Sequence, residues 1–130
     1  MGSTSNQSFT ELIAWQLARK FKNDIFELSQ KLPADEKYRL IDQIIRSSRS
    51  IGANIAEGHG RYTYKEQLNY CIQACGSLSE TNNHLIDAFD CSYINEECLK
   101  KFQAQIDEPG KVLNGYISFL RGNLKPKTEN

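Results

Sequence analysis

Apolar residues recur at steps of three and four along most of this 130-residue chain, which is the spacing of amphipathic α-helices. The first run predicts a helix over residues 9–31, which Pro33 ends because the residue before a proline avoids helical geometry. The second run predicts a helix over residues 35–57. Its main apolar seam is expected to hold Tyr38, Ile41, Ile45, Ser48, Gly52 and Ile55, with Ile44 and Ile51 alongside.

Two further runs predict two longer helices. Thr63 with Glu66 three residues on forms a capping box, so a helix is expected over residues 64–90. Asn82 is the one polar residue in the apolar seam of that helix and is expected to fix its register. The last helix is expected over residues 96–121. Pro109 should kink it or divide it in two, because proline removes a helical hydrogen bond.

Four amphipathic helices with short connections predict an all-α fold, an antiparallel up-down-up-down four-helix bundle over residues 9–121. Residues 1–8 and 122–130 are polar, and we expect them to form a disordered arm and a disordered tail. No stretch reaches the roughly 20 apolar residues of a membrane span, and no signal peptide is visible. The cysteines are expected to be reduced thiols, which favours a cytoplasmic protein with no membrane partner.

The connection between the second and third helices is the most distinctive stretch, and it spans residues 50–61. Gly58 is expected to stop the second helix in the left-handed conformation, which glycine adopts at little cost. Glu57 lies in the last turn, where the helix dipole disfavours an acid, so we expect it to pair with Arg61 or Arg46. Asn54 and Glu57 are expected to tie the turn together.

Charge is unevenly distributed, although the net charge is zero. Residues 37–65 hold six basic side chains and two acids, whereas residues 66–110 hold eight acids and two lysines. One basic face is therefore possible; the alternative is a solvated surface on which the charges interleave. The candidate phosphate ligands around the turn are Arg46, Arg49, Arg61 and Lys65.

Residues that would support catalysis or metal binding are few. A carboxylate-bridged di-iron bundle needs Glu-x-x-His on two helices, but only Glu80 and His84 approach this, at a spacing of four. Zinc on Cys71, Cys75 and either His59 or His84 would need tetrahedral geometry, whereas cysteines on an apolar seam behave as small hydrophobes. We therefore expect no metal, no cofactor and no enzymatic activity.

Two large aromatic residues lie away from the main apolar seam of the first helix. Trp15 and Phe26 are about three turns apart, roughly opposite the seam that holds Phe21. Exposed aromatics often mark an interface, so both are expected to contact another copy of the chain. The alternative is that this helix is buried broadly against its neighbours.

Residues 46–80 resemble the bacterial four helix bundle protein family, also called 23S rRNA intervening-sequence proteins. The carrying motif is Asn54-Ile55-Ala56-Glu57-Gly58 with Arg61 following, together with Gln43, Arg46, Ser50-Ile51, Lys65-Glu66, Ala74, Gly76-Ser77-Leu78 and Glu80. Trp15-Gln16, Pro33, Tyr38 and Tyr93-Ile94 extend the resemblance over nearly the whole chain. Ile45 and Cys75 stand where the family pattern has basic residues.

The resemblance implies a bundle that assembles into a homo-oligomeric ring, typically a pentamer, and it implies no enzymatic activity. Relatives of this bundle type bind nucleic acid and a reverse transcriptase. We therefore expect a bacterial protein that binds RNA or DNA through basic residues near the turn between the second and third helices. The alternative is a scaffold or adaptor that engages a protein partner and makes no contact with nucleic acid.

Overall fold

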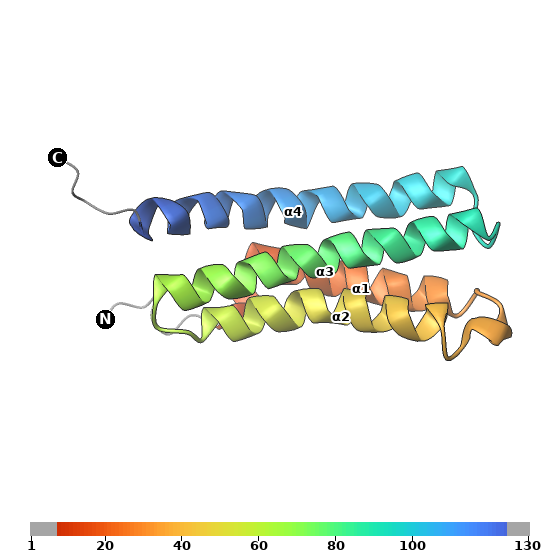
Figure 1. Ribbon diagram of the computed structural model, residues 1–130, viewed down its shortest axis with the longest axis horizontal. Helices are drawn as coiled ribbons and strands as arrows, with labels where there is room; N and C mark the ends of the chain where they lie inside the picture. The colour runs from red at the N-terminus through yellow and green to blue at the C-terminus, as the bar shows by residue number, and fades with distance from the viewer. Residues whose placement is uncertain (1–7, 125–130) are drawn as a thin grey trace.

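The computed structural model describes residues 8–124, and within that range it contains helices and turns but no strand. Four long helices lie side by side (Figure 1). Two short 3-10 turns precede the first two helices. The elements in chain order are η2 Phe9–Glu11, α1 Ile13–Ser29, η3 Ala34–Glu36, α2 Leu40–His59, α3 Tyr64–Asp90 and α4 Glu96–Leu124.

The helices enclose one main core. Each helix packs against the next in the chain, and α1 also packs against α4, so the four follow one another around the core. Side chains from all four helices are fully buried there, and they include Phe21, Ile25, Ile44, Leu85 and Leu120. A smaller cluster of Leu32, Leu40 and Ala88 closes the end of the bundle where η3 lies. The predicted all-α four-helix bundle is confirmed.

The first two helices begin later than expected. Ser8 caps the turn η2, because its hydroxyl accepts the Thr10 amide at 3.1 Å, and α1 starts only after that turn. Residues 34–36 likewise form η3 rather than the first turn of α2. The Glu36 carboxylate accepts the Leu40 amide at 3.3 Å and so satisfies a free N–H at the true start of α2.

The apolar register of α2 also differs from the predicted one. Its inward face carries Leu40, Ile44, Ile51 and Ile55, all of which are buried. Tyr38 precedes the helix and is 84% exposed, so its expected place in the main seam is wrong. Helix α2 packs against both α1 and α3, so apolar residues cover a wide part of its surface. Apolar residues three and four apart can then be grouped into either of two neighbouring rows, and the sequence alone does not say which row faces the core.

The two later helices agree more closely with the sequence. Thr63 caps α3, since its hydroxyl accepts the Glu66 amide at 3.1 Å. Asn82 is partly buried, and its side-chain oxygen accepts Gln103 Nε2 of α4 at 2.9 Å. Pro109 is buried inside α4 and does not divide it.

The ends of the chain differ partly from expectation. Gly122–Leu124 continue α4, although a tail was expected from residue 122. Residues 1–7 and 125–130, the rest of the predicted arm and tail, lie outside the described residues. None of the described helices combines the length and the apolar content that crossing a membrane requires.

A hydrogen bond between Tyr93 and Glu36 predicts that the stability of the fold depends on pH. The Tyr93 hydroxyl donates to Glu36 at 2.7 Å, and with the Leu40 amide it lowers the pKa of that carboxyl below its usual value. A carboxyl whose folded pKa is lowered stabilises the fold above its unfolded pKa, and this contribution is lost as pH falls through the folded pKa. Glu36→Gln is therefore expected to lose less stability than the parent between pH ~5 and pH ~3.

Urea unfolding at several pH values measures this difference. Asp35→Asn is the matched control, because Asp35 is an exposed acid in the same turn. Equal losses of stability in the parent protein and in Glu36→Gln would contradict the assignment.

Candidate functional site

Arg61 is the anchor of the connection between α2 and α3. Its guanidinium donates to the Glu57 carboxylate and, at 2.9 Å, to the Tyr70 hydroxyl. It also lies over the Tyr70 ring, 5.0 Å from the ring centroid, and its side chain is 37% exposed. Glu57 therefore pairs with Arg61 rather than with Arg46. An arginine held by these groups is less available to a phosphate than an open one.

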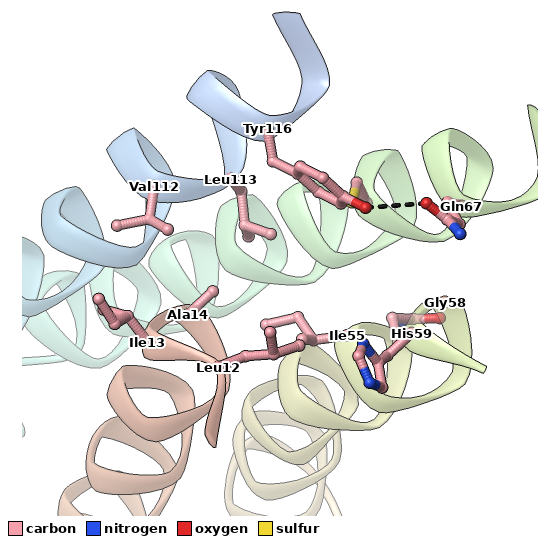
Figure 2. A pocket seen from close by; sticks show the side chains of 12 residues that line it. Leu12, Ile13, Ala14, Ile55, Gly58, His59, Gln67, Val112, Leu113 and Tyr116 are labelled. Carbon is pink, nitrogen blue, oxygen red and sulfur yellow. Dashed lines mark hydrogen bonds between the residues drawn. The ribbon is translucent and has the colours of Figure 1, made fainter. Parts of the chain in front are cut away.

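Gln67 of α3 links the same turn to the bundle. Its Nε2 donates to the Arg61 carbonyl at 2.9 Å, and its Oε1 accepts the Tyr116 hydroxyl of α4 at 2.8 Å (Figure 2). Both halves of the amide are thus used. The turn is therefore bonded to α2 through Glu57 and to α3 through Gln67 and Tyr70, and Gln67 is bonded in turn to α4.

Asn54 does not bond to Glu57, so its expected role in tying the turn is corrected. Its Nδ2 donates to the Ser50 carbonyl at 2.9 Å and to the Ser50 hydroxyl at 3.1 Å, one turn earlier. The Ser50 hydroxyl accepts from Ser77 of α3 at 2.9 Å. Ser47 and Thr81 pair in the same way at 2.8 Å. Asn54 therefore belongs to a row of hydroxyl bonds that joins α2 to α3.

The sequence shows only the spacing of the residues in this row. Hydroxyl residues three or four apart lie on one face of a helix, and both α2 and α3 carry such a pair among their apolar positions. That the hydroxyls would pair across the interface was not predicted, because helix register is not visible in the sequence.

Gly58 has a different role from the one predicted. No glycine in residues 8–124 has a positive φ, and α2 continues through Gly58 to His59. Gly58 is buried against α3, where a Cβ atom would come within 2.8 Å of Tyr70 Cβ. The glycine is therefore needed for close packing between α2 and α3 and not for a left-handed stop.

The four predicted phosphate ligands do not form one compact patch. The Arg46 side chain is 78% exposed and is 3.5 Å from Asp42. Arg49 lies over the ring of Phe26 at 5.7 Å, on the side of α2 that faces α1. Lys65 is exposed in the first turn of α3 and makes no ion pair with a described residue. Arg61 is held in the turn, about 18 Å along the helix axis from Arg49.

The two predicted interface aromatics differ in exposure. Trp15 is partly buried and packs against the core, and its edge contacts the Phe9 ring with centroids 5.3 Å apart. A Cβ atom on Gly52 would lie 3.5 Å from Trp15 Nε1, so the indole also covers α2. Phe26 is 42% exposed, and the Arg49 guanidinium lies over its ring. Broad burial therefore accounts for Trp15, whereas much of Phe26 stays exposed.

The cysteines and histidines do not gather into a cluster. All four cysteines are free, and burial raises the pKa of Cys71 to about 11. Burial also raises the pKa of Cys75. His84 Nε2 lies 3.3 Å from a Glu80 carboxylate oxygen within α3. Among residues 8–124 no three side chains of His, Cys, Asp or Glu are placed to hold a metal ion.

One feature of the structure was missed entirely by the sequence analysis. A pocket of about 240 Å³ opens at the end of the bundle where the α2–α3 turn lies, and residues from all four helices line it (Figure 2). Its walls are mostly aliphatic and include Ile13, Ile55 and Leu113, with Tyr116 on one side. In the sequence, each of these residues has the pattern of an ordinary core or surface position. No local sequence signal therefore indicates the pocket.

Comparisons with known proteins give a family and a structural relative. Residues 10–115 match the family model described as 23S rRNA-intervening sequence protein. A solved structure from Bacteroides thetaiotaomicron, described as a protein with unknown function from the S23 ribosomal protein family, is 26% identical with a TM-score of 0.75. The match covers 81% of this chain and 98% of that chain. No curated protein matches the chain.

Proposed function

Since the chain belongs to the 23S rRNA-intervening sequence protein family, we propose that it is a non-enzymatic, homo-oligomeric bundle that binds RNA or DNA. The binding surface is formed by basic residues of α2 and of the α2–α3 turn. We further propose an up-down-up-down order of the helices, a ring of five copies and a cytoplasmic location. The protein needs no cofactor and acts by binding alone.

The observation that carries the nucleic-acid proposal is the exposure of two arginines on α2. Arg46 and Arg49 are three residues apart and both are exposed. Among the described residues, Arg46 is paired with Asp42 at 3.5 Å, and Arg49 is in no ion pair. Exposed pairs of this kind contribute little energy, so phosphate can replace the acid. Arginine presents a planar fork that matches phosphate oxygens, and repetition around a ring would strengthen a weak site through avidity.

The proposed assembly has its own support in the exposed aromatic surface. Phe26 lies on α1 and is 42% exposed, so much of its ring is available to another copy. Aromatic residues are enriched at protein interfaces. We therefore place Phe26 in the contact between copies, together with Trp15, which lies about three turns away on the same helix.

Removing both arginines tests the proposed surface. Arg46→Ala with Arg49→Ala is expected to weaken binding of short labelled RNA and DNA about tenfold or more at low salt, because two phosphate contacts are lost. Fluorescence anisotropy measures the affinity, and light scattering checks that the oligomer is intact. Arg61→Ala should change the affinity less than the double variant, because its guanidinium is held by Glu57 and Tyr70.

The matched control removes the same amount of charge elsewhere. Lys100 and Lys101 are exposed on α4, so Lys100→Ala with Lys101→Ala lowers the net charge equally without touching α2. An equal loss of affinity in both double variants would mean that only net charge matters. Unchanged affinity in the arginine variant would exclude α2 as the binding surface.

A scaffold or adaptor is the second candidate function, and the fixed position of Arg61 favours it. A turn whose arginine is already bonded to Glu57 and Tyr70 offers a protein partner a rigid surface. If an intact oligomer binds neither RNA nor DNA at low salt, the scaffold or adaptor function is the candidate that remains.

A further inference from the structure

The pocket at the α2–α3 end of the bundle is a cavity rather than a shallow surface groove. Its floor is formed by Ala14, Ile55 and Leu113, which belong to three different helices and are all buried. Its rim carries exposed apolar side chains, with Ile13 64% exposed and Val112 38% exposed. Figure 2 shows Ile13 and Val112 beside each other at one side, and Tyr116 on α4 further along. An apolar molecule could therefore enter past the rim and contact the buried floor.

The lining determines which ligands suit the cavity. No Lys, Arg, Asp or Glu of the described residues lines it, and His59 is the one histidine in the lining, so a charged ligand would lose its hydration with at most one imidazole beside it. Gln67 has both amide groups engaged, with the Arg61 carbonyl and the Tyr116 hydroxyl. Asn54 uses its NH₂ group on Ser50. The floor and walls can therefore make mainly apolar contacts with a ligand.

The volume sets the size of the ligand. The cavity measures about 240 Å³. An apolar cavity of about 150 Å³ engineered in another protein stays dry and binds benzene. A molecule somewhat larger than benzene, such as a bicyclic aromatic compound, matches this cavity better.

We propose that this cavity is a binding site for a small, neutral, largely apolar molecule of about the size of indole or naphthalene. The site is independent of the arginines on α2, so it stands whether or not the protein binds nucleic acid. The cavity is lined by residues of four helices and reaches the buried side chain of Leu113, which suits a compact molecule better than the flat face of a partner helix.

Indole and naphthalene are the probes for the test. Either probe is expected to raise the melting temperature with increasing concentration, because a ligand that binds only the folded state stabilises it. Cys71 lines the cavity, so each probe should also slow its modification by methyl methanethiosulfonate. That rate is measured in the triple variant Cys75→Ser, Cys91→Ser and Cys98→Ser, in which Cys71 is the remaining thiol.

A variant that fills the cavity gives the decisive comparison. Ala14→Leu adds three carbon atoms at the floor and is expected to abolish both effects while the protein stays folded. Ala104→Leu makes the same change on the exposed surface of α4 and should leave both effects intact. Val112→Trp at the rim is a second blocking variant in case Ala14→Leu does not fold.

Two results would overturn the proposal. The first is the absence of both a melting shift and Cys71 protection at the solubility limit of the probes. The second is a fall in oligomer mass in Ala14→Leu without any probe binding to the parent protein. The latter would mean that a side chain of another copy occupies the cavity.

Discussion

Replacing Gly58 by valine is expected to lower the free energy of unfolding by about 3 kcal/mol. Gly58 is buried where α2 meets α3, and an added Cβ atom would lie 2.8 Å from Tyr70 Cβ. Tyr70 Cβ is attached directly to the backbone of α3, so it cannot rotate away and the two helices must separate. Urea unfolding at a fixed protein concentration measures the loss.

Alanine at the same position separates packing from helix propensity. Alanine favours a helix over glycine by about 1 kcal/mol, so Gly58→Ala tests whether the contact with Tyr70 outweighs that gain. Gly76 is the matched control, because it is exposed within α3 and an added Cβ atom would meet nothing within 4 Å. Gly76→Ala should stabilise the protein and Gly58→Ala should destabilise it. Stabilisation by both would show that the packing at Gly58 is looser than described.

Replacing Phe21 by alanine is expected to cost about 4 kcal/mol, which approaches the whole stability of a small domain. Phe21 is 1% exposed at the centre of the core and packs against Phe102 of α4, with ring centroids 6.5 Å apart. The interface between α1 and α4 is smaller than those between the other neighbouring helices. A cavity at Phe21 should therefore weaken the packing of α1 against α4. Calorimetry or urea unfolding measures the cost.

Phe26 gives the matched control for Phe21, because it is the same residue type on the same helix but is 42% exposed. Phe26→Ala should leave the unfolding energy of the single chain nearly unchanged and should lower the mass of the oligomer. Equal destabilisation by the two variants would mean that Phe26 contributes to the fold. An unchanged mass would remove Phe26 from the interface.

The sequence predicts the number of helices and the starts of the two later ones, because a clear cap such as Thr63 precedes a long unbroken apolar pattern. It places the start of α2 too early. At the true start, the Glu36 carboxylate accepts both the Leu40 amide and the Tyr93 hydroxyl. Tyr93 is far away in the sequence, so no local pattern contains its part of this arrangement.

In the candidate site, too, some contacts can be predicted from the sequence and others cannot. Glu57 and Arg61 are four residues apart, and this spacing alone suggests that they pair. The role of Gly58 depends on Tyr70, and the roles of the hydroxyl residues depend on how α2 and α3 are aligned. Those contacts, like the cavity, exist only after helices distant in sequence have packed together.

The proposal that this bundle binds nucleic acid is tested most directly by the salt dependence of its affinity for short RNA. Each phosphate contact with a single strand adds about 0.7 to the slope of log affinity against log salt concentration. We predict a steep fall in affinity between about 50 and about 200 mM salt, and a slope about 1.4 units shallower in Arg46→Ala with Arg49→Ala. No binding at the lowest salt by an intact oligomer would contradict the proposal, as would an affinity that salt does not change.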